Sequence, residues 1–460
     1  MKTNYSDNFF NVSSEFGFLP QNRPITSLPK RYSELQNILD RMPVELPDGN
    51  PGILAIPNKI ENEVENLPNY LELVKKEDDV MIIQGLFRGY CFLSSAFTLE
   101  SSYQEFVKSK KYGKARNFLP QQIAQPFVYV AEKLDVYPWL EYHYAYSLGN
   151  FKVLDGSNNF HWSNLDQCVK FSGKKDETGF IMNHVDINQH SPDLVKSAFG
   201  IANSKNNESS LNKYLKLFAN TLKRINKRRK VMWEASRWKH YNDFRVFIMG
   251  IKGNEEIFPN GLIYEGVWDR PKYFRGQTGA QDNIIPTADI VSGVINFYPE
   301  NQLTKYLLDL RKYRPICVQN FFEILTKEMR SAPLLKRLTK TDNQLGMYYL
   351  MSAYEEIYFF RNGHWQFVQK YIMQNTKYAK ATGGTPIISW IPNQIKAVFS
   401  AMQNLSDQMK ESNHWVKSKW IESYLKKIEL LNKQLEILSI DTFNPESVFK
   451  LNEEIGLEDF

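Results

Sequence analysis

One long segment, residues 345–373, repeats apolar side chains at three- and four-residue steps, the spacing of one face of an α-helix. A single histidine, His364, lies in this stripe between Phe360 and Phe367, directly after Gly363. A buried imidazole needs a partner, because an unpaired polar group costs about 1–3 kcal/mol. The partner is either a hydrogen-bonding group of an ordinary core or a metal, such as the iron of a flat cofactor that Gly363 would let approach the backbone. Periodicity alone favours the core histidine.

Composition sets the class of protein. The chain has 460 residues, 42% hydrophobic and 14% aromatic, so it can bury a large core and build flat apolar pockets. The net charge of +6 is small for this length and too diffuse to indicate a nucleic-acid partner by itself, and no such partner is expected. The scattered cysteines Cys91, Cys168 and Cys317 form no CxxC or CxxCH motif. This excludes a zinc ribbon and a covalently attached c-type haem, and it favours a reducing compartment.

Two further features bear on location. Residues 1–20 are polar and lack the apolar segment of a signal peptide. No stretch has about 18 uninterrupted apolar residues, the length of a membrane-spanning helix. The nearest, residues 81–99, contains Gln84 and Arg88 and is expected to be a buried helix. The sequence therefore predicts a cytoplasmic protein with no membrane partner.

Helical periodicity dominates the chain, so we expect a mainly α fold. The proline-rich segment before residue 59 is expected to be a loop-rich arm with one short helix. Helices are predicted at residues 31–41, 59–76 (kinked or broken at Pro68), 78–99, 121–134, 139–148, 211–233, 289–297, 301–312 and 317–327. A turn-rich stretch, residues 149–176, marks a boundary. The expected division is a small N-terminal domain (1–170), a large domain (171–400) and a C-terminal extension (401–460).

One short motif suggests a different metal site. His184 and Asp186 have the HxD spacing of non-haem iron oxygenases, which bind iron with two histidines and one carboxylate. That site needs a β-rich barrel and a second, distant histidine, whereas this chain is helical. A surface polar triplet is the alternative interpretation. The sequence contains no dinucleotide-binding, P-loop, zinc-protease or serine-hydrolase motif.

Several blocks carry a family resemblance. They are LP and IAQP within residues 119–126, FRVFIMGIKGN (244–254), GLIYEGV (261–267), FRGQTGAQ (274–281), RNGH (361–364) and TGGT (382–385). In this order and spacing they resemble the indoleamine 2,3-dioxygenase family of haem enzymes. The resemblance covers about residues 115–390. It implies a two-domain, all-helical fold with haem in the larger domain.

The resemblance implies roles for individual residues. His364 falls on the proximal haem ligand, and Asp289 and Arg361 fall on a pair near it that an ordinary helix–helix ion pair would also explain. Arg245 matches the residue that binds the substrate carboxylate, which suits the two parallel bonds of a guanidinium–carboxylate pair. Thr382 would bond the amino-acid end of the substrate, and the neighbouring glycines would let its loop close.

Other implied roles concern the distal side of the haem. His184 stands where most animal members of the family have a serine, and Phe180 and Tyr241 accompany it. Together with Arg245 they look like the pocket of tryptophan 2,3-dioxygenase. A neutral imidazole there can accept a hydrogen bond from the indole N–H. His184, in this role, and Arg245, which would bind the substrate carboxylate, are the expected catalytic residues. Gly279 is a further substrate-binding position, and His240 would line the pocket mouth.

The implied reaction inserts O2 across the C2–C3 bond of L-tryptophan or a close indole, with haem b bound non-covalently and N-formylkynurenine as the product. Two alternatives stay open: oxygenation of another aromatic substrate in secondary metabolism, and a haem sensor without turnover. The basic run 223–230 predicts a solvated helix face, or alternatively a docking site for an acidic electron donor. An apolar stripe over residues 421–438 predicts a helix that packs on the large domain or forms a dimer seam, so monomer and homodimer both stay open.

Overall fold

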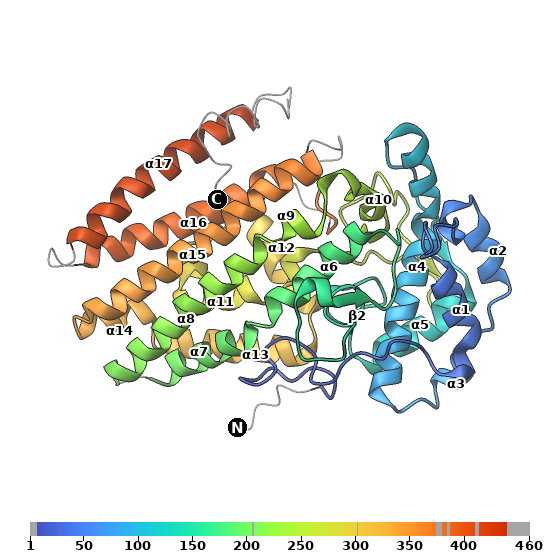
Figure 1. The fold of residues 1–460 in the computed structure, drawn as a ribbon, viewed down its shortest axis with the longest axis horizontal. Helices are drawn as coiled ribbons and strands as arrows, with labels where there is room; N and C mark the ends of the chain where they lie inside the picture. Colours follow the sequence, from blue (N-terminus) through green and yellow to red (C-terminus); the bar gives the residue numbers. More distant parts are fainter. Residues whose placement is uncertain are drawn as a thin grey trace.

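The computed structural model describes residues 7–204, 207–300, 302–373, 380–383, 387–409 and 414–438. This part of the chain is mainly α-helical, as its periodicity predicts (Figure 1). The described strands are short and form two ladders. Strand β1 (Phe118–Leu119) pairs in parallel with β4 (Ile263–Tyr264), and β2 (Phe151–Val153) pairs antiparallel with β3 (Leu165–Gln167).

The N-terminal part is organised around α4 (Val80–Ser109). Helices α1 (Ser33–Arg41), α2 (Lys59–Glu65) and α5 (Gln121–Lys133) pack against it, and α3 (Leu71–Val74) packs on α5. Of the two predicted alternatives at Pro68, a kink or a break, the structure has the break, since α2 and α3 are separate helices. By length and composition α4 could cross a membrane, but 83% of its most apolar stretch is buried inside the protein, as expected of a core helix.

The larger bundle surrounds α15 (Gln344–Val368). This helix packs against α8 (Glu208–Arg229), α11 (Ile284–Ser292) and α16 (Ile387–Gln408), and α17 (His414–Leu438) lies along α16 (Figure 1). The remaining helices are α6 (Lys175–Asn188), α7 (Ser191–Asn203), α9 (Met232–Ala235), α10 (Asn242–Arg245), α12 (Gln302–Asp309), α13 (Ile316–Ser331) and α14 (Leu334–Lys340).

Helix boundaries depart from the predictions in several places: α4 runs to Ser109 instead of residue 99, for example, and α8 ends at Arg229 instead of residue 233. Residues 139–148 contain only one π-helical turn, Tyr142–Tyr146, rather than an α-helix. The helix expected over 289–297 begins earlier, and it ends at Ser292 because Gly293 adopts a left-handed φ of 81°. In contrast, the segment predicted over 345–373 is one helix, α15, followed directly by the π-helical turn Gln369–Met373.

Helix α17 packs back onto the bundle. Trp420 and Leu431 are buried, and Trp365 on α15 donates its indole N–H to the side-chain oxygen of Gln434 at 2.7 Å. Ile421, part of the predicted apolar stripe, is instead 39% exposed. Within the described residues the C-terminal extension is thus part of the hydrophobic core. The domain boundaries at residues 170 and 400, and the oligomeric state, stay predictions.

Candidate active site

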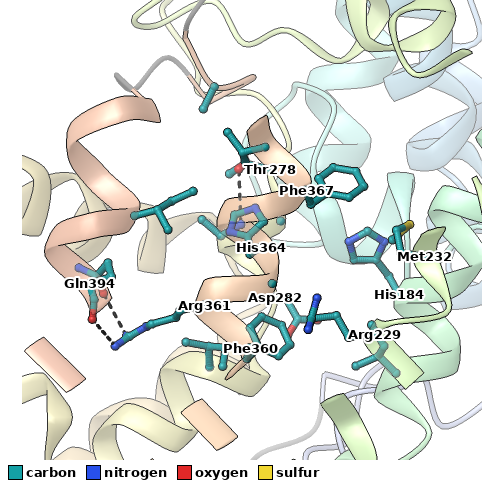
Figure 2. A pocket seen from close by; sticks show the side chains of 18 of the residues that line it. His184, Arg229, Met232, Thr278, Asp282, Phe360, Arg361, His364, Phe367 and Gln394 are labelled. Carbon is teal, nitrogen blue, oxygen red and sulfur yellow. Dashed lines mark hydrogen bonds between the residues drawn. The ribbon is translucent and has the colours of Figure 1, made fainter. Parts of the chain in front are cut away.

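A cavity in the larger bundle brings most of the predicted site residues together. Helices α6, α8, α11 and α15 and the segment 380–383 enclose it, and Figure 2 shows the two imidazoles that face this space, His184 from α6 and His364 from α15. Its lining is mostly apolar. The predicted residues that line it are Phe180, His184, Tyr241, Gly279, Asp289, Arg361, His364 and Thr382.

His364 is presented to this cavity by the last turns of α15. Its side chain is open to the cavity although it lies deep in the protein. Burial, together with smaller effects of the Arg229 charge and of the neighbouring His184 ring, lowers the pKa of His364 to about 4, so the imidazole is neutral. Within the described residues, neither ring nitrogen has a hydrogen-bond partner. The hydrogen-bonded core histidine that periodicity favours is therefore not what the fold contains.

Asp289 and Arg361 form a buried ion pair on the wall beside His364. A guanidinium nitrogen of Arg361 lies 2.6 Å from the Asp289 carboxylate, and the two side chains are 6% and 1% exposed. Tyr298 donates its hydroxyl hydrogen to the same carboxylate oxygen, and Arg361 also bonds the main-chain and side-chain oxygens of Gln394 on α16. The other carboxylate oxygen, Oδ1, has no partner among the described residues. This pair joins α11, α15 and α16 at the cavity.

His184 faces the cavity in a defined tautomer. Its Nδ1 lies 3.0 Å from the main-chain carbonyl oxygen of Phe180. Because a carbonyl only accepts, Nδ1 carries the hydrogen and Nε2 is left as an acceptor. Burial lowers the pKa of His184, against the opposing effect of the Asp282 carboxylate, and this keeps the ring neutral. Phe180 and Tyr142 pack edge-on against the imidazole and fix its orientation.

Arg245 lies behind the cavity wall rather than on it. Its side chain is fully buried, and it donates to the Tyr112 hydroxyl at 2.8 Å and to the Lys380 carbonyl at 2.6 Å. Tyr241, whose ring does line the cavity, interacts with the same guanidinium. Nε of Arg245 has no partner among the described residues. The arginine therefore ties α10 to the segment that carries Thr382.

The segment 380–383 is held from several sides. The Thr382 hydroxyl donates to the Gln277 carbonyl at 2.7 Å, and the Thr382 carbonyl accepts the Gly250 N–H at 2.8 Å. Tyr306 donates to the Gly383 carbonyl at 3.1 Å. Gly384 and Thr385, the second half of the predicted TGGT loop, lie outside the described residues. Thr382 thus lines the cavity with its hydroxyl already bonded.

Comparison with known proteins decides the family. The model described as indoleamine 2,3-dioxygenase matches residues 6–419. The chain belongs to the indoleamine 2,3-dioxygenase family. It is 24% identical to indoleamine 2,3-dioxygenase 1 of Rattus norvegicus, over 83% of this chain and 92% of the relative, and 26% identical to that of Mus musculus, over 81% and 86%. A 6-hydroxytryptophan 2,3-dioxygenase of Fusarium equiseti is 23% identical over 66% of this chain and 70% of the relative.

Membership makes the protein an oxidoreductase of the indole dioxygenase class, a class that depends on haem and O2. The residues present fit a haem. The neutral imidazole of His364 offers a nitrogen lone pair with no competing partner among the described residues. Apolar side chains, including Phe360, Phe367 and Val368, surround it in the cavity. This donor and its setting are those a flat, largely apolar iron cofactor requires.

Two predicted positions lie elsewhere in this family member. His240 does not line the cavity, and its Nδ1 lies 3.1 Å from the Asp243 carboxylate. Asp186 is fully buried and accepts from Nε of Arg228 at 2.7 Å, so it is not part of a surface triplet. The described residues contain no cluster of three metal-ligating side chains, which gives no support to an HxD iron site. Residues two apart on a helix point to nearly opposite sides, which separates His184 from Asp186.

Arg229 is one of the cavity residues that the sequence interpretation missed, together with Asp282 and Gln394. The basic run was expected to face solvent, but Arg229 lines the cavity. Leu211, Leu215, Phe218, Leu222 and Ile225 form the buried stripe of α8 at four- and three-residue steps, and Arg229 is the next position in register. A Cβ built on Gly363 would lie 2.1 Å from a terminal nitrogen of Arg229, so this glycine makes room for the guanidinium instead of the expected cofactor edge.

Proposed function

We propose that this protein is a haem b dioxygenase that cleaves the indole C2–C3 bond of L-tryptophan or a close indole. From tryptophan the product is N-formylkynurenine. The observation that carries the proposal is a neutral, unpartnered His364 and a neutral His184 on two walls of one mostly apolar cavity. A cytoplasmic location and an electron donor that keeps the iron ferrous belong to the same proposal.

In the proposed reaction, the residues around the cavity would hold the iron, orient its ligand and position the substrate. His364 would hold the iron, and Asp289, with its unpartnered Oδ1, would orient that ligand together with Arg361. When bound, haem supplies the redox chemistry by which both atoms of O2 join the indole. Phe180 and Phe367 form aromatic walls that can position a flat ring and exclude water.

His184 would accept the indole N–H at Nε2, the nitrogen that its bond to Phe180 leaves available. Gly279 and Thr382 line the same cavity, where the amino-acid end of the substrate would meet them. A glycine at position 279 has no neighbouring heavy atom within 4 Å of the place a Cβ would occupy, so this stretch leaves open space beside the substrate. The proposed site thus combines one acceptor for the indole with main-chain and hydroxyl groups for the amino acid.

Arg245 has N–H groups left for the substrate carboxylate. The Tyr112 hydroxyl and the Lys380 carbonyl each accept a bond from one terminal nitrogen, whereas Nε has no partner among the described residues. Arg245→Ala should retain haem but lower kcat/KM for tryptophan roughly ten- to a hundredfold, the value of a charge-assisted hydrogen bond. Tyr112→Phe is the matched control, because it frees one nitrogen and keeps the charge. Equal kinetics of Arg245→Ala and wild type would contradict the carboxylate role.

The protonation state of His184 gives a pH prediction. Burial lowers the pKa of His184 below the ordinary 6.5, and the Asp282 carboxylate raises it by a smaller amount. His364 is the other histidine that faces the cavity, and its pKa is also lowered. The His184 ring therefore stays neutral from about pH 8 down to about pH 6.5, and kcat/KM should be flat over this range and fall only in more acid solution. His184→Gln keeps an acceptor that does not titrate, so its profile should lose that acid limb. An identical limb in both proteins would rule out His184 as its source.

The product assay tests the function itself. Haem-loaded, reduced protein mixed with air and L-tryptophan should form N-formylkynurenine, measured by its ultraviolet absorbance. The Fusarium relative favours a second candidate, a hydroxylated indole as the preferred substrate. A panel of L-tryptophan, D-tryptophan and 6-hydroxytryptophan distinguishes the two by kcat/KM. A haem spectrum that responds to these indoles without any product would instead indicate a sensor.

A further inference from the structure

A second hollow lies on the outer side of α8 and α15. It is a groove of about 660 Å³. The residues that line it are Asn220, Lys223, Arg224, Asn226, Lys227, Arg229, Lys230, Glu356, Phe359, Asn362, Gly363 and Gln366. We propose that this groove binds a small polyanion carrying phosphate or carboxylate groups, with Arg229 as its innermost contact. Nothing in the indole reaction requires such a site.

The charge of the groove is unbalanced. Lys223, Lys227 and Lys230 are exposed and have no carboxylate partner among the described residues. Arg224 is the exception, since it pairs with Asp193 at 2.5 Å. Glu356 is the one acidic residue of the described lining, and its carboxylate accepts the side-chain amide of Asn226 at 2.9 Å. Such a row of like charges around a concavity creates a positive potential that attracts anions.

Arg229 distinguishes this groove from a solvated helix face. Its guanidinium turns inward, and the bonds it makes are long: 3.3 Å to the Asn226 side-chain oxygen and 3.4 Å to the Phe359 carbonyl. It has no carboxylate partner among the described residues, whereas neighbouring Arg228 pairs with Asp186. Burial lowers its pKa to about 10, which expresses the cost of a desolvated charge without a counterion. An anion in the groove would offset that cost.

The shape favours a small molecule over an acidic protein. The groove volume lies within the roughly 300–1,000 Å³ typical of small-molecule sites. Besides Asn226, which already bonds Glu356, three amide side chains line the groove and can donate neutral hydrogen bonds to phosphate or carboxylate oxygens: Asn220, Asn362 and Gln366. Arg229 and Gly363 close the bottom and also line the His364 cavity. An acidic protein surface could therefore contact the lysines at the rim, but it would not reach Arg229 at the bottom of the groove.

The shared position of Arg229 predicts coupling between the two hollows. Its charge acts on His364, so an anion bound to it should make the region around the proposed iron ligand less positive. The reduction potential of the haem should then shift to a more negative value. This coupling rests on the proposed haem function, whereas anion binding by the groove does not.

Pyrophosphate is the probe for the test. Calorimetry on the purified full-length protein, whether or not it takes up haem, should show one site per chain whose affinity falls as salt rises. Arg229→Gln should weaken binding at least roughly tenfold, and Lys227→Gln with Lys230→Gln should weaken it as well. Lys216→Gln is the matched control, because it removes an exposed charge from the same helix outside the groove and should leave the affinity unchanged. Gly363→Ala keeps every charge but displaces the guanidinium, so it should mimic Arg229→Gln.

Three results would overturn the inference. One is the absence of pyrophosphate binding at millimolar concentration. Another is equal binding by wild type, the groove variants and Lys216→Gln, which would show only a diffuse ion atmosphere. The third is binding of a poly-glutamate peptide but not pyrophosphate with the same dependence on the lysines, which would make the groove a protein-docking face. Loss of dioxygenase activity leaves all three readouts measurable, so the two proposals fail separately.

Discussion

Replacing His364 with alanine should give a folded protein that takes up no haem, shows no Soret band and has no dioxygenase activity. The reason is that His364 is the neutral imidazole that faces the cavity without a hydrogen-bond partner among the described residues. Asp289 and Arg361 are already bonded to each other, and His184 lies on another helix. Hemin titration and a pyridine hemochromogen assay measure the loss directly.

The matched control for this variant is His184→Ala, which removes the other imidazole of the same cavity. It should retain haem and its Soret band while losing catalytic efficiency with indoles. Added imidazole should restore the Soret band of His364→Ala, because the truncated side chain leaves a space of the same shape. A His364→Ala protein with wild-type haem content and spectrum would reject the ligand assignment and with it the proposed function.

Local sequence pattern predicted the elements of the site better than its contacts. Periodicity over 345–373 is enough to predict α15, because apolar side chains at three- and four-residue steps lie on one face of an α-helix. Pattern also predicts that His364 lies on that face. It does not predict that the ring lacks a partner, since this depends on α6, α8 and α11, which approach from distant parts of the sequence.

Arg229 and Arg245 show where such reasoning stops. A basic run suggests a solvated face, but the register of the buried leucines on α8 places Arg229 on the inward face. The helical periodicity of the sequence therefore contained this information, although the run of positive charges suggested an exposed position. For Arg245, the resemblance implies a ligand-binding role, yet the arginine is bonded to Tyr112 and Lys380, more than a hundred residues away in the chain. Only tertiary structure reveals these two bonds and the place of the guanidinium behind the cavity wall.

Among the substitutions proposed for this protein, Asp289→Ala, which breaks the Asp289–Arg361 pair, should lower the free energy of unfolding most. Asp289→Ala would leave the Arg361 guanidinium buried with no counterion, while Tyr298 would lose the acceptor of its hydroxyl. Removing one partner of a buried ion pair costs about 3–5 kcal/mol. We therefore expect a marked drop in the urea midpoint of the haem-free protein, where cofactor binding cannot contribute. The exposed pair Glu422–Lys426 provides the control, because its loss should cost at most about 0.5 kcal/mol.

A double variant separates stability from cofactor binding at the same place. Asp289→Leu combined with Arg361→Met removes both charges, so it should recover much of the stability that Asp289→Ala loses. It leaves no carboxylate or guanidinium to orient His364, so haem should bind more weakly and its ferrous spectrum should change. If the double variant recovered stability and also kept wild-type haem affinity and spectrum, the pair would be an ordinary link between helices. If Asp289→Ala cost less than about 1 kcal/mol, the pair would not stabilise this junction at all.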